Sequence, residues 1–459
     1  MRMELYGGPI RVRRLLFLLL IVSAVVAAAV AFLPLGLFRL AALAVLALPF
    51  AAVLFDRPKW ILYILLIILF SNLDIFAPFH IFRLTIVFLL ASFAFSLACG
   101  RKFIVHDRRF AFLLVAFLIL VLQSLTVARD LDTSLWRLNL FIKVLINIAI
   151  TIQFVRNRIE FRHLFIVIAI GVLLSNLLPF VLEPPEKYAN VSLMWGKGIL
   201  RYEGYAFEAN LFGLFQLFVI PILIFLAAAY KKPKFARPVL LIALFSALVV
   251  LILSFSRGGF VSLVFLVVGL LIIERKNRAI LITDLLVMVV GAALVPAAYW
   301  ERIGSLLDFG TQFSQDYNII TRWEGMKAAM IMGLKNPLLG IGLENYLYNA
   351  SRYVQYNLVV HNSVLQIFAE AGVFALAVLA SMIFYNIRII RGLMKRRDDV
   401  EAAQAGRMLL LQHIVVFIGS MFIATAYTDI FWWTLALPSI AGYAYRKNSS
   451  EVVGPAAAA

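Results

Sequence analysis

Apolar runs, most of them roughly 17–22 residues long, alternate with short polar segments along most of this chain of 459 residues. Such a run is about long enough to cross the hydrocarbon core of a bilayer as an α-helix. A helix satisfies its own backbone hydrogen bonds in lipid, so we expect helices rather than barrel strands. The pattern predicts about fourteen spans, at residues 15–33, 37–55, 60–76, 82–98, 110–127, 138–154, 164–182, 209–229, 239–255, 260–273, 280–299, 363–390, 408–426 and 430–445.

One long interval, residues 299–361, interrupts this alternation. A connection of about sixty residues is too long for a plain connector and is usually functional. Within it, Thr321-Arg322-Trp323-Glu324 has the spacing of a capping box, and a Pro follows at Asn336-Pro337. We expect a short amphipathic helix between these points, either anchored at the membrane interface or closing over a site. Its apolar residues recur at helical spacing: Trp323, Met326, Met330 and Leu334.

Composition agrees with a membrane protein. Hydrophobic residues make up 64% of the chain, above the roughly 45–50% that is usual in soluble domains. The formal net charge of +18 resides in short clusters between the apolar runs, without interleaved aromatic residues, so it does not indicate a nucleic-acid partner. We therefore expect residues 1–459 to form a single all-α integral membrane domain that carries the long loop at 299–361.

The basic clusters predict the orientation of the chain. Cytoplasmic loops of membrane proteins carry an excess of lysine and arginine. Placing both termini in the cytoplasm puts most of the 42 lysines and arginines in inside loops, and every such loop is then basic. The interval 299–361 falls outside. The sequence thus predicts a multi-pass membrane protein, with its long loop on the non-cytoplasmic side and membrane lipids around it.

Two arginines on the predicted outer side are candidates for binding an anion. Arg257 lies in Ser256-Arg257-Gly258-Gly259, a tight turn between two spans, and Arg201 lies in the outer segment before residue 209. Charged groups near membrane depth are costly and suggest function. A guanidinium fork can meet two oxygens of a diphosphate at once. The alternative for Arg257 is an ordinary pairing with lipid headgroups or with a carboxylate such as Glu208 or Glu344.

His361 is the candidate proton acceptor. Of the five histidines, only His80 and His361 fall outside in the predicted topology. A histidine is the usual group to take a proton from a sugar hydroxyl near neutral pH. The alternative is structural, because Ser363-Val364-Leu365-Gln366 fits a capping box and His361 would then only precede a helix.

The sequence gives no sign of a metal site or a nucleotide site. Acidic residues in the predicted outer loops are single or paired, and no ligand set has convincing spacing. No phosphate-binding P-loop and no dinucleotide glycine motif occurs. We therefore expect no metal and no cofactor.

Three motifs in sequence order resemble the O-antigen ligase and polymerase superfamily of bacterial membrane glycosyltransferases. The first is Ser256-Arg257-Gly258-Gly259, and the second is Asn336-Pro337-Leu338-Leu339-Gly340-Ile341-Gly342-Leu343-Glu344-Asn345-Tyr346. The third is His361-Asn362-Ser363-Val364-Leu365-Gln366 with Glu370-Ala371-Gly372. The resemblance covers about residues 201–372, and the earlier spans are similar only in character.

The resemblance implies a helical fold of the GT-C type and a donor glycan linked to undecaprenyl diphosphate, used without metal or nucleotide. In ligases of this superfamily a histidine of the large periplasmic loop is the presumed base, and two outer arginines handle the diphosphate. These roles fall on His361, Arg201 and Arg257. Transfer to an acceptor sugar hydroxyl would invert the anomeric centre. Further candidates for the site are Arg322, Glu344 and Glu203.

Other activities stay open at this stage. About fourteen spans exceed the twelve typical of the ligases, and polymerases of the same superfamily often have the larger number, so a polymerase stays open as the alternative to a ligase. The acceptor would be lipid A-core for a ligase and a growing glycan for a polymerase. A lipid-linked oligosaccharide flippase would have a similar span number, but it would need charges along its first spans, where Lys143 is the one candidate, and it would leave the long loop unexplained.

Overall fold

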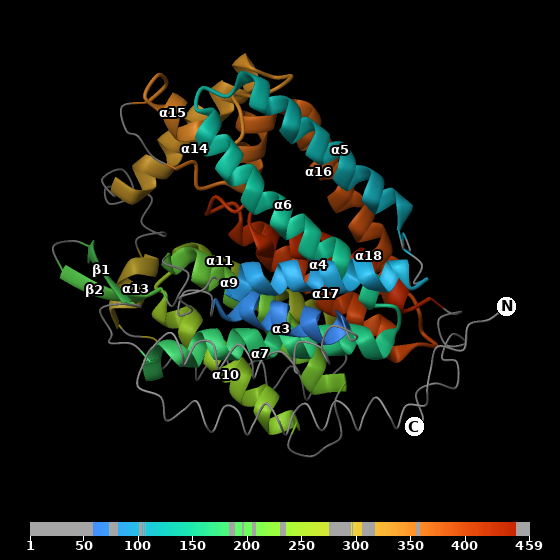
Figure 1. Ribbon diagram of the computed structural model, residues 1–459. Coiled ribbons are helices and arrows are strands. Elements are labelled where there is room, and N and C mark those ends of the chain that lie inside the picture. The colour runs from blue at the N-terminus through green and yellow to red at the C-terminus, as the bar shows by residue number, and fades with distance from the viewer. Residues whose placement is uncertain are drawn as a thin grey trace, which may run out of the picture. The chain divides into compact units, whose positions relative to one another are not determined.

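The computed structural model describes residues 58–72, 81–100, 103, 105, 107–182, 189–194, 197–203, 208–229, 236–274, 295, 297–304, 317–354 and 359–446. These residues are mostly helical (Figure 1). Eleven of the predicted spans coincide with described helices, whereas 15–33, 37–55 and most of 280–299 lie outside the described residues. The chain forms two compact units, residues 1–69 with 73–103, and residues 70–72 with 104–459. The first contains α4 (Ile81–Ala98) and most of α3 (Pro58–Ser71).

The second unit contains the remaining helices. Among the residues that the structure describes, six helical segments are long and apolar enough to cross a membrane, which makes this a multi-pass membrane protein: α5 with η2, α6, α7, α9, α16 and α17. The bounds are α5 (Arg108–Ser124), η2 (Leu125–Val127), α6 (Leu131–Phe154), α7 (Arg158–Leu182), α9 (Ala209–Ala229), α10 (Ala236–Leu253), α11 (Arg257–Ile273), α16 (Ser363–Met394), α17 (Val400–Gly419) and α18 (Asp429–Ala444).

Helix α17 lies at the centre of this unit and packs against α9, α11, α16 and α18. On the far side of α16 lies α5, which runs alongside it (Figure 1). Aromatic residues fill the space around α18, where the ring of Trp432 lies 4.8 Å from Phe117 and 4.9 Å from Phe141. Its indole Nε1 donates to the carbonyl of Ala426 at 2.7 Å, so the buried N–H is satisfied.

The loops are joined in two groups, as an alternating topology requires. Among the loops predicted to be inside, Arg158 pairs with Asp399 at 2.5 Å, and Arg407 pairs with Glu274 at 2.9 Å. Among those predicted to be outside, Asn345 binds the backbone of Asp130. The inside loops thus contact one another and the outside loops contact one another. Which group faces the cytoplasm stays a prediction.

A β-hairpin precedes α9, so the prediction of an all-helical chain is wrong at this point. Strands β1 (Ala189–Met194) and β2 (Lys197–Tyr202) pair antiparallel (Figure 1). The alternation of polar and apolar residues in Asn190-Val191-Ser192-Leu193 is typical of a strand. This signal is only a few residues long, and the surrounding apolar spans outweigh it in the sequence.

Three helices occupy the described part of the long interval, namely α13 (Ala297–Gly304), α14 (Tyr317–Lys335) and α15 (Tyr346–Ala350). Helix α14 lies where the amphipathic helix is predicted, and it ends before Asn336-Pro337 as predicted. The predicted capping box is wrong, because the helix begins at Tyr317 and Thr321 lies inside it. The large apolar residues Trp323 and Leu334 are each 66% exposed, so they do not pack on the protein core.

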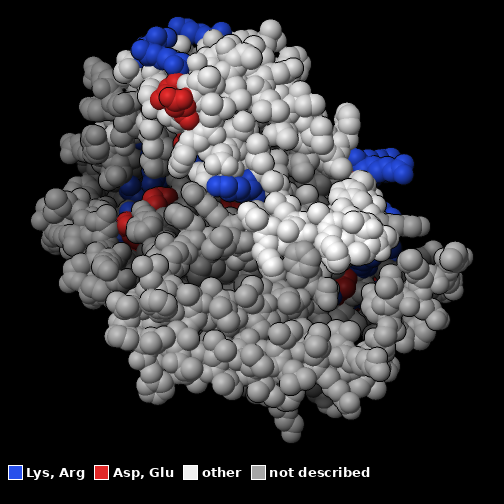
Figure 2. Space-filling model, viewed as in Figure 1, with Lys and Arg blue, Asp and Glu red and all other residues white. Residues whose placement is uncertain are grey.

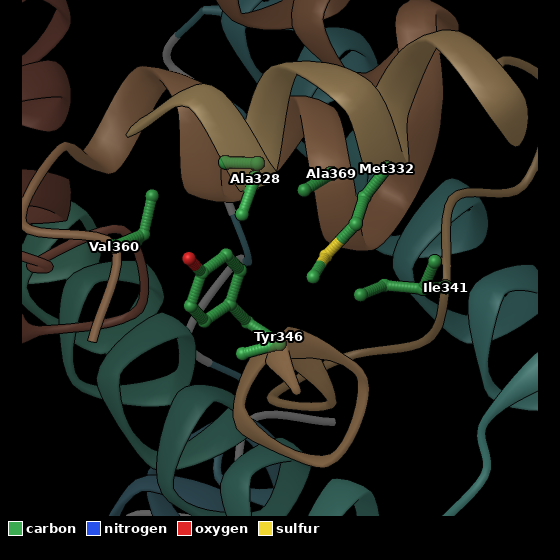
Figure 3. Close-up of a cluster of buried hydrophobic side chains, with 8 residues drawn as sticks. Ala328, Met332, Ile341, Tyr346, Val360 and Ala369 are labelled. Atoms are coloured by element: carbon green, nitrogen blue, oxygen red, sulfur yellow. The ribbon is translucent and has the colours of Figure 1, made fainter. Parts of the chain in front are cut away.

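Small residues form the buried face of α14. Together with α15 and the residues before α16 they make one hydrophobic cluster (Figure 3). The ring of Tyr346 lies within it, and its hydroxyl donates to the carbonyl of Gly325 at 2.8 Å. The cluster therefore holds α14, α15 and the segment next to His361 as one body. Its buried members are Ala328, Ala329, Met332, Ile341, Tyr346, Ala350, Val360 and Ala369.

Helix α16 is broken at Gly372, where φ is 81° and ψ is −176°. The free backbone groups at the break bond to residues 337–342: the amide of Val373 donates to Pro337 at 2.7 Å, and the amide of Ile341 donates to Ala369 at 2.9 Å. A Cβ added at Gly372 would lie 2.6 Å from the carbonyl oxygen of Leu338. The break therefore requires glycine on conformational and on steric grounds.

We expect Gly372→Ala to lower the free energy of unfolding by about 2–4 kcal/mol, because it combines backbone strain with a clash against backbone atoms. The measurement is thermal unfolding in detergent. Gly392→Ala, in the same helix, is the matched control, since nothing lies within 4 Å of its added Cβ. The control should unfold at the wild-type temperature or slightly above it. Equal melting temperatures for the two variants would contradict the prediction.

Candidate active site

Arg257 is the first residue of α11 and is buried, with 4% of its surface exposed. Ser256 caps the helix, and its hydroxyl accepts a hydrogen bond from the amide of Gly259 at 3.1 Å. The predicted turn between two helices is present, with φ of 50° at Phe255. The glycines serve packing within the protein: a Cβ added at Gly258 would lie 2.7 Å from the side chain of Phe422.

Arg201 lies on β2 and reaches the same turn. Its Nε donates to the carbonyl of Ser254 at 3.0 Å, and its Nη2 donates to Oδ1 of Asn210 at 3.1 Å. The amide of Asn210 in turn donates to Glu208 at 2.8 Å. These bonds fix the hairpin against the α10–α11 turn, so Arg201 is held next to the turn that precedes Arg257.

The two arginines share an electrostatic environment. Burial is the main cause that lowers the pKa of Arg201, and the carboxylates of Glu208 and Glu203 oppose it. The positive charge of Arg257 lowers the pKa of Arg201 further. Two like charges at partly buried positions favour an anion that both can contact. Of the candidate residues, Glu203 thus joins the arginine group.

His361 lies two residues before α16, in a left-handed conformation with φ of 46°. Its Nδ1 is buried and makes no hydrogen bond to the part of the chain that the structure describes. The next residue, Asn362, caps α16, since its Oδ1 accepts from the amides of Val364 and Leu365 at 3.1 and 3.0 Å. His361 is therefore not the cap. A strained backbone and an unsatisfied nitrogen at one residue are typical of a functional position.

The capping-box prediction at Ser363 is wrong, because this hydroxyl bonds to a different segment. It donates to the carbonyl of Ile423 at 2.8 Å and accepts from the amide of Thr425 at 2.7 Å. The Ser363 amide also donates to the carbonyl of Ser420 at 2.8 Å. Ser363 therefore ties the start of α16 to residues 420–425, which follow α17. The predicted span 408–426 corresponds to α17, which ends earlier, at Gly419, because the residues that follow it bond to Ser363.

The environment of His361 keeps its imidazole neutral. Burial, and secondly the positive charge of Arg322 on α14, lower the pKa of His361 to about 4. At neutral pH the ring is unprotonated and has a lone pair available to accept a proton. Arg322, a further candidate from the sequence, therefore lies close enough to His361 to affect its pKa.

Glu344 forms an ion pair and belongs neither to the arginine group (Arg201, Arg257 and Glu203) nor to the histidine group (His361 and Arg322). Its Oε1 lies 2.6 Å from Nη2 of Arg137 on α6, and φ at Glu344 is 55°. Nearby, Glu370 of α16 is buried and accepts a bond of 3.5 Å from Gln366. Sequence reasoning missed Arg137 and named Glu370 only as part of a motif, without a role. An acid within the apolar run after Ser363 was the available signal, because buried charges in membrane helices need partners.

Residues 420–425 join the arginine group to the histidine group. Phe422 packs on Gly258, next to Arg257, while Ser420 and Ile423 bond to Ser363. The gap at this junction, lined by Asn210, Ser256, Phe422 and Ile423 among others, has a volume of only about 10 Å³, so these residues are closely packed. Figure 2 shows basic and acidic side chains close together on this face, between α14 and the β1–β2 hairpin.

Carboxylate and imidazole groups do not cluster in the described residues. No three or more His, Cys, Asp or Glu side chains come together there in a group that could hold a metal ion. The expectation of a metal-independent reaction stays a prediction from the sequence.

The fold and these residues define a helical multi-pass membrane protein with arginines and a neutral histidine joined through one turn. Residues 239–380 match the protein-family model described as O-antigen ligase. The match contains Arg257, Arg322, Glu344 and His361, and it confirms that the chain resembles the O-antigen ligase and polymerase superfamily. No curated protein matches the chain.

Proposed function

We propose that this protein transfers a glycan from undecaprenyl diphosphate to an acceptor sugar hydroxyl, at the periplasmic face of a bacterial inner membrane. One observation carries the proposal: within the O-antigen ligase match, His361, whose Nδ1 is buried and whose pKa is lowered, lies two residues from Ser363, which bonds to the same turn that packs on Gly258 next to Arg257. The protein would act as a metal-independent, inverting glycosyltransferase with a GT-C-like fold, in the manner of an O-antigen ligase.

His361 acts as the general base in this proposal. Its neutral imidazole takes the proton of the acceptor hydroxyl, while the hydroxyl oxygen attacks the anomeric carbon of the donor sugar. The bond between that carbon and the diphosphate oxygen breaks, and the anomeric centre is inverted. Arg201 and Arg257 neutralise the charge that develops on the departing diphosphate.

The test is an in vitro transfer assay with purified protein and a defined undecaprenyl-diphosphate-linked glycan. With lipid A-core as acceptor, product formation supports a ligase. A second donor molecule used as the acceptor tests the alternative, a polymerase of the same superfamily. Donor movement across vesicles without any glycosidic product would support a flippase and contradict the proposal.

The pKa of His361 predicts the pH dependence of transfer. Because its pKa lies near 4, the base stays unprotonated and kcat/KM should be constant from pH 7 to about 5, then fall as pH approaches 4. Arg322→Gln removes a positive charge that lowers this pKa, so the acid limb should move to higher pH. The measurement is the pH profile of kcat/KM for both proteins. An acid limb that does not move in Arg322→Gln contradicts the assignment.

Cysteine labelling tests the sidedness of the site. In a Cys99→Ser background, a cysteine at the exposed Ser351 should react with an impermeant maleimide added from outside. A cysteine at the exposed Arg397, in a predicted inside loop, should react only after the inner face is opened. The reverse pattern would place His361 in the cytoplasm and exclude a periplasmic site.

A further inference from the structure

A polar cavity of about 610 Å³ lies where η2 ends, α6 begins and α15 packs beside them. Arg129, Asp132, Leu347, Tyr348 and Ser351 are among its lining residues. Figure 2 shows basic and acidic side chains next to one another over this region. The proposed transfer chemistry does not use any of them.

Hydrogen bonds fix the two walls of this cavity to each other. The fully buried side chain of Asn345 accepts from the amide of Asp130 at 2.7 Å and donates to its carbonyl at 3.0 Å. Nη1 of Arg129 donates to the carbonyl of Tyr348 at 2.8 Å, and the Tyr348 hydroxyl lies 3.0 Å from that of Thr133. The cavity is therefore formed before any ligand arrives, which lowers the entropic cost of binding.

The lining residues match both the apolar and the hydrogen-bonding surfaces of a sugar. Tyr348 and Leu347, which are 44% and 41% exposed, offer apolar area for the C–H face of a pyranose ring. Asp132 is exposed, and its carboxylate makes no side-chain hydrogen bond to the described residues, so it can accept from sugar hydroxyls. Hydroxyl oxygens can in turn accept from the guanidinium of Arg129.

Helix α15 connects this cavity to the candidate active site. One face of the helix, with Tyr346 and Ala350, belongs to the same hydrophobic cluster as Val360, the neighbour of His361 (Figure 3). Leu347 and Tyr348 lie outside that cluster and face the cavity. The cavity and His361 are thus held at a fixed spacing by one packed core. Because the cavity and His361 are formed by different residues, only a glycan that extends beyond the reacting sugar could occupy both places at once.

We propose that the cavity beside Tyr348 and Asp132 is a subsite for sugars of the glycan chain that are remote from the reacting hydroxyl. The inference rests on the proposed function, since that function supplies the glycan. Binding remote parts of a substrate gives an enzyme energy with which to orient the reacting group. The subsite would therefore make the protein prefer chains of several repeats to a single repeat.

The test measures binding separately from transfer. The probes are oligosaccharides released by mild acid from the surface polysaccharide of the source bacterium, labelled at the reducing end and fractionated into one repeat and several repeats. Fluorescence polarisation with the purified full-length protein should show binding of the longer fraction at least about tenfold tighter. A tenfold change corresponds to the loss of one good contact.

Asp132→Ala and Tyr348→Ala should each remove about tenfold of the affinity for the longer fraction and leave binding of the single repeat unchanged. The exposed Arg388→Ala, on α16 in a predicted inside region, is the control and should behave as wild type. Melting temperatures verify folding, and Asp132→Ala carries the test if Tyr348→Ala unfolds, since Asp132 is exposed.

Two failures are distinguishable. Equal binding of both fractions by the wild type, or unchanged binding by Asp132→Ala, overturns the subsite while transfer activity stands. A wild type that binds the longer fraction through Asp132 but transfers no glycan to any acceptor overturns the proposed function and leaves a glycan-binding site.

Discussion

Replacing His361 by alanine is expected to lower glycan transfer by about 10²–10⁴-fold, the usual contribution of a positioned general base. Binding of the lipid-linked donor should stay near the wild-type value, because Arg201 and Arg257 belong to a separate set of contacts. The fall should therefore appear in kcat. Single-turnover transfer and donor binding, measured on the same protein, separate the two effects.

Ser363→Ala is the matched control, because it removes a structural group two residues away. Its buried hydroxyl bonds to Ile423 and Thr425, so the variant should lose about 1–3 kcal/mol of stability. His361→Ala should unfold at nearly the wild-type temperature, since Nδ1 makes no hydrogen bond to the described residues. An active, folded His361→Ala would refute the assignment of the base.

Arg257→Lys is expected to reduce transfer about ten- to a hundredfold even though the charge is kept. Lysine lacks the planar fork that can bond two diphosphate oxygens at once. The loss corresponds to roughly 1.5–3 kcal/mol for a charge-assisted contact. Titrating the donor against wild type and variant should show weaker binding together with slower transfer.

Arg407→Lys serves as the comparison for this substitution. Arg407 pairs with Glu274 at 2.9 Å among the predicted inside loops. It lies away from the proposed diphosphate site, so replacing its guanidinium by the ammonium group of lysine should leave transfer unaffected. Arg257→Ala then reports the loss of the charge itself. If a folded Arg257→Ala turns over normally, Arg257 has a structural role in the α10–α11 turn.

Most of the helical layout could be predicted from the sequence, because a span needs about twenty apolar residues and little else. Helix α9 matches its predicted span at residues 209–229. The errors occur where hydrogen bonds between distant parts of the chain determine where a helix ends. Helix α17 ends at Gly419 because residues 420–425 bond to Ser363, a contact over more than fifty residues that no local pattern encodes.

For the candidate site, the sequence likewise predicted the residues but not all of their contacts. The sequence singled out Arg201, Arg257 and His361, and the structure ties Arg201 to the turn before Arg257. It could not foresee that Asn362 is the cap of α16, because serine and asparagine cap helices equally well. It also missed the pairing of Arg137 with Glu344, since the partners are far apart in the chain.

The turn at residues 420–425 sets a limit on building chimaeras from relatives. The O-antigen ligase match ends at residue 380, yet Phe422 packs on Gly258 and Ser420 bonds to Ser363. Arg201, on β2, also lies before the match begins. A graft of residues 239–380 into another scaffold would therefore carry one arginine and the histidine without the parts that align them. Exchanges should move the hairpin, the matched region and the turn after α17 together.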